Sequence, residues 1–194
     1  IHIGGATFAD AYEASRVFAA ERGLIEIHAY ASFETLIGQG SIAVEWAEQS
    51  PDLDTMIIAV GGGGLIGGMA AFAQGRTRII GVEPENAPTL TAALAAGEPV
   101  DVAVSGIAAD SLGARRLGPL TLPLAQRYVE AVKLVTDAEI LAAQKRIWDV
   151  LRVVVEPGAA TTMAVLLTGR YVPAPDERLG VLLCGANTTA VSFG

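Results

Sequence analysis

The stretch TMIIAVGGGGLIGGMAAFAQGRTRIIGVEPE, Thr55 to Glu85, decides the fold of this chain. An apolar run leads into four consecutive glycines, then a segment of small residues, then a second apolar run that ends at Glu83. Short runs rich in Val and Ile that flank a helix-length segment are typical of parallel strands joined by a helix. The stretch predicts a strand over 55–60, a helix ending near residue 74, and a strand over 78–83. A glycine loop between strand and helix points consecutive amides into one concavity, which predicts a bound phosphate.

The same alternation of apolar runs and helix-like segments continues along the whole chain. Further strands are predicted at 1–3, 25–28, 132–135, 153–155 and 179–184, and further helices at about 7–22, 41–48, 88–96, 137–151 and 158–167. A Gly-Gln-Gly turn is expected at Gly38–Gly40, Thr7 and Thr136 are expected N-caps, and Gly23 an expected helix stop. The predicted fold class is therefore α/β, with an open, mainly parallel twisted sheet and helices on both faces.

Composition narrows the class of protein. With 52% hydrophobic and 18% charged residues, the chain has ample material for a core. The net charge of −8, with 13 basic residues in no long cluster, argues against nucleic acid and anionic membranes as partners. The single cysteine, Cys184, excludes an internal disulfide and a cysteine-rich metal site. The apolar runs are too short to cross a bilayer, so we expect a cytoplasmic protein.

The glycine loop is open to more than one interpretation. A P-loop is excluded, because no Lys-Ser or Lys-Thr follows the glycines. Gly62, Gly64 and Gly67 satisfy the dinucleotide pattern G-x-G-x-x-G, and Glu83 ends the next strand where a ribose contact is expected. Against a dinucleotide, Pro84 follows at once and the run has one glycine more than that turn requires. A tight turn with close packing would need only one or two glycines, which favours a bound phosphate.

Six segments in register carry a resemblance to a known family. They are ETLIGQGSIAVE (34–45), GGGGLIGG (61–68), GVEPENAPT (81–89), VSGIAADSLG (104–113), VEPGAATTMAV (155–165) and LLCGANTTAV (182–191). In this order they resemble the pyridoxal-phosphate enzymes of the tryptophan synthase β type (fold type II), specifically the serine/threonine dehydratases. Any one segment is a weak signal, but together they cover essentially the whole chain.

The resemblance implies pyridoxal 5′-phosphate as cofactor and assigns residues to it. The amides of Gly61, Gly62, Gly63, Gly64 and Leu65 would hold the phosphate. Cys184 stands where relatives meet the pyridine nitrogen with Ser, Thr or Cys, a neutral partner that makes the ring a weaker electron sink. Glu156 is expected near the cofactor ring. From the residues alone, Cys184 could be a small buried apolar side chain and Glu156 a carboxylate at a helix N-terminus.

The resemblance also implies a cation site. Glu83 and the carbonyl of Ala87 fall where many relatives bind a monovalent or divalent cation. The third ligand of the magnesium-binding members is usually Asp, and Thr89 stands at that position here. This substitution favours a potassium or sodium ion held mostly by carbonyls over a divalent ion.

The family's catalytic lysine, which forms the Schiff base with the cofactor, lies well before the glycine loop. Both lysines of this chain, Lys133 and Lys145, follow the loop, and neither has the family's sequence context. We therefore expect that this chain holds no catalytic residue. We also expect that it is a carboxyl-terminal portion of a larger enzyme and that this portion alone is inactive. Residues 1–31 would be a remnant of the small domain. Residues 32–194 would be the large cofactor-binding domain, incomplete at its N-terminal side.

The function implied for the parent enzyme is that of a threonine/serine ammonia-lyase. It would convert L-threonine or L-serine, its amino-acid substrate, to a 2-oxo acid and ammonia, and we expect a homo-oligomer, dimer or tetramer, of the full-length protein. Serine racemase of the same family is the nearest alternative. A non-catalytic NAD- or phosphate-binding α/β module is the alternative from another class.

Overall fold

The computed structural model describes residues 2–5 and 8–188. Its four strands are β1 (Thr55–Ala59), β2 (Arg78–Pro84), β3 (Ala131–Val135) and β4 (Leu179–Val181). The helices are α1 (Phe8–Arg22), α2 (Phe33–Gln49), α3 (Gly64–Ala73), α4 (Thr89–Ala96), α5 (Ala109–Leu112), α6 (Thr121–Tyr128), α7 (Asp137–Leu151) and α8 (Pro157–Leu167). Within the described ranges, no helix combines the length and the apolar character that crossing a membrane requires.

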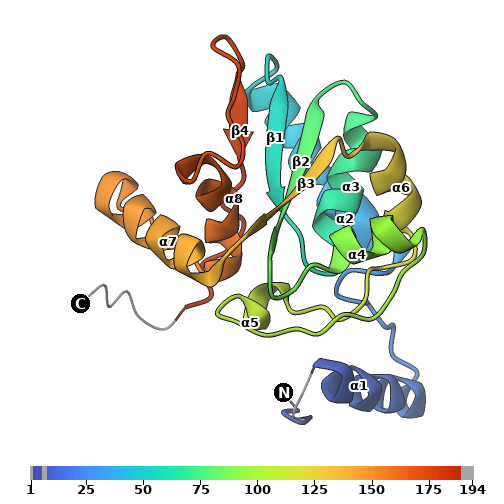
Figure 1. The fold of residues 1–194 in the computed structure, drawn as a ribbon. Coiled ribbons are helices and arrows are strands. Elements are labelled where there is room, and N and C mark those ends of the chain that lie inside the picture. Colours follow the sequence, from blue (N-terminus) through green and yellow to red (C-terminus); the bar gives the residue numbers. More distant parts are fainter. Residues whose placement is uncertain (1, 6–7, 189–194) are drawn as a thin grey trace.

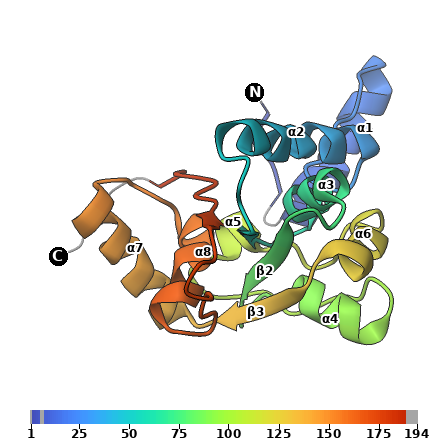
Figure 2. The same cartoon turned by 90° about the horizontal axis from the view of Figure 1, so that it is seen from above.

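The four strands form one parallel sheet in the order β3-β2-β1-β4 (Figure 1). Ile57 of β1 lies opposite Ile80 of β2 and Val181 of β4. Helices α2, α3, α4 and α6 lie on one side of the sheet and α7 and α8 on the other, as the view from above shows (Figure 2). The predicted fold class, a parallel α/β sheet with helices on both faces, is confirmed.

The core is divided by the sheet into two layers. Ile57 and Ile80 point toward α7 and α8, whereas their neighbours Ile58 and Ile79 pack under α3 with Ile66. All five of these side chains are almost fully buried. A strand buried on both faces has no polar face, which is why the sequence shows unbroken Val and Ile runs at these strands.

The prediction of a turn at Gly38–Gly40 is wrong, because these residues lie inside α2. The glycines instead allow α2 and α3 to pack closely. A Cβ on Gly68 of α3 would overlap the Leu36 carbonyl, and a Cβ on Gly40 would lie 3.2 Å from the Gly68 carbonyl oxygen. Small residues at a helix crossing were thus mistaken for a chain reversal.

Three predicted strands are also wrong. Residues 2–3, 25–28 and 153–155 are not strands, and Ile1 lies outside the described residues. Ile3 and Ile25 are more than nine-tenths exposed, so their apolar character does not reflect a buried strand. The Val155 carbonyl accepts a hydrogen bond from the Gln144 side chain, at 2.9 Å, instead of one from a neighbouring strand.

The helix boundaries predicted by capping residues agree better with the structure. Gly23, directly after α1, has a φ of 62°, as expected of a glycine stop. The expected cap Thr7 lies outside the described residues. Helices α5 and α6 were missed: α5 has only four residues, and α6 begins only at the end of the irregular stretch from Pro84 to Pro123. Figure 1 shows α1 set apart from the sheet, while the proposed division at residue 31 stays a prediction.

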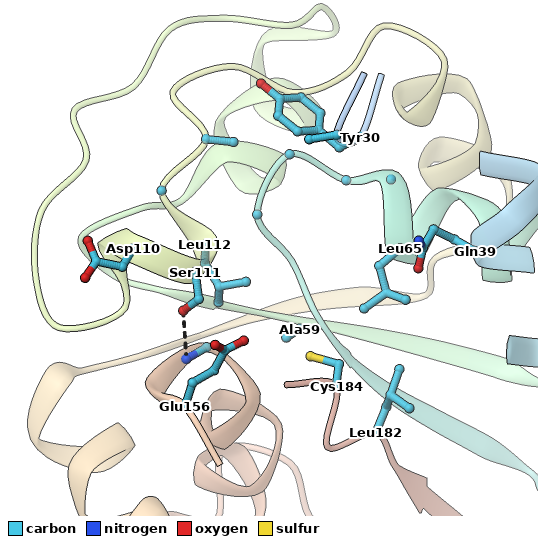
Figure 3. Close-up of a pocket in the computed structure, with 18 of the residues that line it drawn as sticks. Tyr30, Gln39, Ala59, Leu65, Asp110, Ser111, Leu112, Glu156, Leu182 and Cys184 are labelled. Carbon is cyan, nitrogen blue, oxygen red and sulfur yellow. Dashed lines mark hydrogen bonds between the residues drawn. The ribbon is translucent and has the colours of Figure 1, made fainter. Parts of the chain in front are cut away.

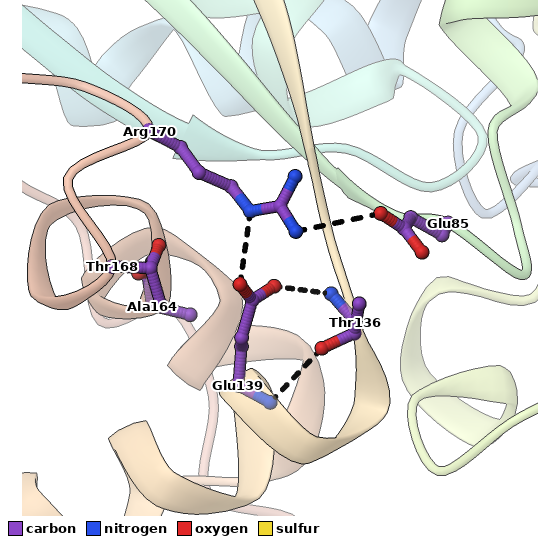
Figure 4. A network of polar contacts seen from close by, with 6 residues as sticks. All are labelled: Glu85, Thr136, Glu139, Ala164, Thr168 and Arg170. Carbon is purple, nitrogen blue, oxygen red and sulfur yellow. Dashed lines mark hydrogen bonds and ion pairs between the residues drawn. The ribbon is translucent and has the colours of Figure 1, made fainter.

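Thr136 caps α7 as predicted, through a reciprocal capping box (Figure 4). Thr136 Oγ1 accepts from the Glu139 amide at 3.3 Å, and Glu139 Oε2 accepts from the Thr136 amide at 2.7 Å. Arg170 Nε donates to Glu139 Oε1 at 3.0 Å, and Arg170 Nη2 forms an ion pair with Glu85 at 3.5 Å. The network joins the end of β2, the start of α7 and the loop after α8.

Candidate active site

A cavity of about 650 Å³ opens beyond the carboxyl ends of β1 and β4 (Figure 3). It is bounded by the glycine loop, by α2, by the segment around α5, by the start of α8 and by the chain after β4. All seven residues predicted to bind the cofactor line it, namely Gly61, Gly62, Gly63, Gly64, Leu65, Glu156 and Cys184. Segments far apart in the sequence are thus brought together where ligands of parallel α/β sheets bind.

The glycine loop presents its amides to this cavity. Within the described chain, the amides of residues 61–65 donate to no backbone carbonyl. Gly63 is the N-cap of α3 with a φ of 90°, so the positive end of the helix dipole lies at the loop. None of the described lining residues is Lys, Arg or His. An anion bound here would therefore be held by backbone amides and the helix dipole.

Packing also requires these glycines, and at more positions than the one or two that a tight turn was expected to need. A Cβ on Gly61 would lie 3.0 Å from the Leu112 Cα, and one on Gly64 would lie 2.8 Å from the Tyr30 Cα. A Cβ on Gly62 would overlap the Tyr30 ring. Close approach of neighbouring segments needs a glycine at each of these positions, so the run of four is not by itself evidence of a phosphate. The amides without a backbone acceptor are the stronger evidence.

Tyr30 covers the outer side of the glycine loop, a position that no local pattern in the sequence indicated. The His28 ring holds it there, because His28 Nδ1 accepts from the Tyr30 amide at 3.1 Å and from the Ala31 amide at 3.0 Å. The rings of Tyr12, His28 and Tyr30 follow one another with centroids 4.7 Å apart. Through these rings α1 contacts the edge of the cavity.

Cys184 and Glu156 lie on the side of the cavity nearest β4 (Figure 3). The Glu156 amide donates to the Gly185 carbonyl at 3.1 Å, and Glu156 Oε2 accepts from the Asn187 amide at 3.1 Å. The Cys184 side chain is exposed to the cavity, yet partial desolvation raises its pKa, and the Glu156 charge raises that pKa further. Cys184 is therefore a neutral thiol at neutral pH.

Ser111 is a second residue that sequence reasoning missed. Its Oγ accepts from the Gly158 amide at 3.1 Å and so joins α5 to the first turn of α8 (Figure 3). A Cβ on Gly158 would overlap this hydroxyl. The signal was present in two of the six matched segments, VSGIAADSLG and VEPGAATTMAV, but their contact is visible only in three dimensions.

Glu83, Ala87 and Thr89 do not line the cavity. The buried Glu83 carboxylate accepts from the Leu90 amide at 2.6 Å, and from the Thr91 amide and hydroxyl at 2.9 and 2.7 Å. Thr89 Oγ1 donates to the Ala114 carbonyl at 2.7 Å. Burial raises the Glu83 pKa to about 7, against the effect of these hydrogen bonds. Glu83 thus anchors the start of α4 and is not placed to meet a ribose in the cavity.

The predicted cation is not supported by this arrangement. Both Glu83 oxygens are already occupied by donors, and the Thr89 hydroxyl is engaged elsewhere. Across the described ranges, no group of three or more His, Cys, Asp or Glu residues could hold a metal. The cation stays a prediction.

Comparisons with known proteins agree with this geometry. Residues 1–185 match the family described as "Pyridoxal-phosphate dependent enzyme". The phenylserine dehydratase of Ralstonia pickettii is 35% identical, over 89% of this chain and 54% of the relative. The serine racemase of Arabidopsis thaliana is 34% identical, over 86% and 52%. The biosynthetic L-threonine dehydratase of Haemophilus influenzae is 34% identical, over 94% and 36%.

Solved structures give the same result. The structure of maize serine racemase superposes with a TM-score of 0.87 at 32% identity, covering 95% of this chain and 58% of that one. The processed form of threonine deaminase isoform 2 from Solanum lycopersicum superposes with a TM-score of 0.87 at 29% identity, covering 96% and 56%. The chain therefore spans about half the length of its first two sequence relatives, and less of the third. By its sequence match, its parallel sheet and its glycine-loop cavity, the chain belongs to the family of pyridoxal-phosphate dependent enzymes.

Proposed function

We propose that this chain is the cofactor-binding part of an ammonia-lyase that acts on β-hydroxy amino acids such as L-threonine or L-serine. The observation that carries the proposal is the cavity itself. One end has consecutive amides that donate to no backbone carbonyl of the described residues, and the other end has a neutral thiol. A cofactor with a phosphate at one end and a ring nitrogen at the other matches these two ends.

The donor set fits pyridoxal 5′-phosphate. The amides of residues 61–65 would hold the phosphate without a cationic side chain, and Cys184 would face the pyridine nitrogen. When bound, this cofactor supplies an electron sink for charge that develops at the amino acid's α-carbon. A thiol whose pKa is raised is not a proton source as strong as a carboxylic acid, so it favours an unprotonated ring nitrogen.

The chain's own residues bind and orient, and we expect none of them to move the substrate's proton. Among the described lining residues, Asp110, Glu156, Cys184, Ser111 and Tyr30 carry titratable or hydroxyl groups, and none is a Lys or His. Glu156 already accepts the Asn187 amide, and Ser111 already accepts the Gly158 amide. The acid–base group is then expected from a lysine outside this chain, so that the chain alone binds the cofactor but does not turn over substrate.

The relatives support a dehydratase and also leave the racemase as the second candidate. Phenylserine and threonine dehydratases match at 35% and 34% identity, and a serine racemase matches at 34%. We favour the dehydratase because two of these three relatives are dehydratases, as their names state. An amino-acid substrate, a homo-oligomer and a cytoplasmic location remain part of the proposal.

The test uses the full-length enzyme that contains this chain, with the 194-residue chain as its control. The full-length enzyme is expected to release 2-oxobutanoate from L-threonine or pyruvate from L-serine, and the chain alone to release neither. Formation of D-serine at a rate above that of pyruvate would establish the racemase instead. Release of 2-oxobutanoate by the chain alone at an enzyme-like rate would contradict the assignment of the acid–base group.

A further inference from the structure

The first residues of α6, and the turn just before it, hold the rear of the glycine loop, on the side away from the cavity. The Gly118 amide donates to the Gly62 carbonyl at 3.0 Å, and Thr121 Oγ1 donates to the Gly63 carbonyl at 3.0 Å. The Thr121 amide in turn donates to the Gly118 carbonyl at 3.0 Å, so the two anchors are fixed to each other. Neither Gly118 nor Thr121 lines the cavity.

These two hydrogen bonds determine where the loop's amides point. In a trans peptide the N–H lies opposite the preceding carbonyl, and the described chain has no cis peptide. With the Gly62 carbonyl directed at Gly118 and the Gly63 carbonyl at Thr121, the amides of Gly63 and Gly64 are directed the other way. That direction is away from α6 and toward the cavity that these glycines line.

A glycine loop needs such anchors because its own backbone has little preference. Glycine adopts positive and negative φ about equally well, so a peptide between two glycines can turn over at small cost. Each turned peptide would present a carbonyl, instead of an amide, to a bound anion. The hydrogen bonds from Gly118 and Thr121, together with the one from the Gly67 amide, therefore favour the orientation in which the loop presents amides to a phosphate.

The Thr121 side chain is held in the orientation that this role requires. It is fully buried, and a Cβ on Gly63 would lie 2.7 Å from its Cγ2. The Gly63 carbonyl also accepts from the Gly67 amide at 2.9 Å, as part of α3. Removal of the Thr121 hydroxyl thus leaves that carbonyl with a partner, and the expected loss is of orientation, not of folding.

We propose that Thr121 is a positioning residue, which directs the amides of Gly63 and Gly64 toward the phosphate of the bound cofactor. The proposal rests on the proposed function, because that function makes the ligand of the loop a phosphate. It goes further in assigning a cofactor-affinity role to a residue that does not touch the cavity.

The experiment compares Thr121→Val, which has the same shape but no hydroxyl, with Thr121→Ser, which keeps the hydroxyl. The probes are pyridoxine 5′-phosphate and pyridoxine. Both lack the aldehyde, so neither bonds to Lys133 or Lys145, and they differ only in the phosphate. Their dissociation constants are measured by calorimetry on each protein, and thermal unfolding confirms that each variant is folded.

Thr121→Val is expected to weaken the binding of pyridoxine 5′-phosphate by roughly 5- to 10-fold, about the contribution of one hydrogen bond. The binding of pyridoxine is expected to stay unchanged. Thr121→Ser should stay within about 2-fold of the parent for both probes, well inside the effect of losing the hydroxyl. If Thr121→Val weakens the binding of both probes equally, or of neither, the positioning role is wrong while the proposed function stands. If the parent chain does not prefer the phosphorylated probe, the proposed function fails and the positioning role fails with it.

Discussion

The Glu156 carboxylate accepts a hydrogen bond from the backbone amide of Asn187, with Oε2 and the nitrogen 3.1 Å apart. A second bond, from the Glu156 amide to the Gly185 carbonyl, runs beside it. Together they tie the start of α8 to the segment that carries Cys184. Glu156 was expected near the cofactor ring, and in the structure its carboxylate holds the segment that carries Cys184.

The reactivity of Cys184 should report this contact. Desolvation and the Glu156 charge raise the pKa of the thiol, so Glu156→Ala should lower that pKa and release the Asn187 amide. We expect Cys184 to react several-fold faster with a chromogenic disulfide reagent at pH 8. Glu156→Gln, which removes the charge but keeps an acceptor for Asn187, should show a smaller increase.

Cys184 is the chain's single cysteine, so the assay reads one site, and Cys184→Ser gives the background. A rate that is the same in the parent, Glu156→Ala and Glu156→Gln would show that Glu156 neither shields nor positions the thiol.

Glu83 should make the chain less stable as the pH rises from about 4 to 8. Its folded pKa is about 7, above the ordinary value of 4.5, so between these values the folded state holds a proton that the unfolded state has lost. Stability from this group is complete below 4.5 and is lost as the pH rises to 7. The loss is up to ~3 kcal/mol, at about 1.4 kcal/mol per pH unit.

Urea unfolding at several pH values measures how the unfolding free energy changes with pH, and Glu83→Gln should make this change smaller. The same experiment tests the predicted cation. If potassium or magnesium raised the unfolding free energy at pH 8 in the parent but not in Glu83→Gln, a cation would be bound at Glu83. A pH dependence that survives in Glu83→Gln would instead assign the titration to another group.

The crossing of α2 and α3 should not tolerate a methyl group. Gly68→Ala would place its Cβ against the Leu36 carbonyl, and we expect a destabilisation of about 1–3 kcal/mol from the forced separation of the helices. Gly38→Ala is the matched control, because it lies in the same helix pair with no atom within 4 Å of its Cβ. It should stabilise the protein by about 0.5–1 kcal/mol through helix propensity. Equal effects in the two variants would show that α2 and α3 do not pack as described.

The capping box of α7 should be measurable by itself. Thr136→Ala removes the acceptor for the Glu139 amide and is expected to cost about 1 kcal/mol of unfolding free energy, whereas Thr136→Ser should keep most of it. The Glu139–Arg170 pair contributes less, since Arg170 is partly exposed and such pairs give about 0–1 kcal/mol. Thermal unfolding of the variants measures which change costs more stability. A larger loss in Arg170→Met than in Thr136→Ala would contradict the expected ranking of the cap above the ion pair.

Local periodicity was enough to predict the sheet and the glycine loop. Strands β1, β2 and β3, helices α7 and α8, and the end of α3 lie within one or two residues of their predicted positions, because each has an apolar pattern that its own sequence shows. The errors fall where an apolar or glycine-rich segment has another reason for its composition. Gly38–Gly40 serve a helix crossing, and Ile25 and Ile27 are exposed.

The site was predicted only in part, because its remaining contacts link distant segments. The seven residues expected around the cofactor do line one cavity, while their roles in binding remain predictions. Thr121 and Gly63 are 58 positions apart, and Gly158 and Ser111 are 47 apart. No local pattern marks such pairs. For Glu83, the strand end and the following helix at 88–96 were both predicted, but not the hydrogen bonds by which the Glu83 carboxylate caps the start of that helix.

Whether the glycine-loop cavity binds pyridoxal phosphate is tested most directly by titrating the ¹⁵N-labelled chain with pyridoxine 5′-phosphate and measuring the chemical shifts of its backbone amides. We expect the largest shifts at the amides of residues 61–65 and of Cys184, saturating together, with little change at Leu90 and Thr91. NAD should leave the loop amides unmoved. If the loop amides do not respond to pyridoxine 5′-phosphate, or if NAD moves them and pyridoxine 5′-phosphate does not, the cavity is not a pyridoxal-phosphate site.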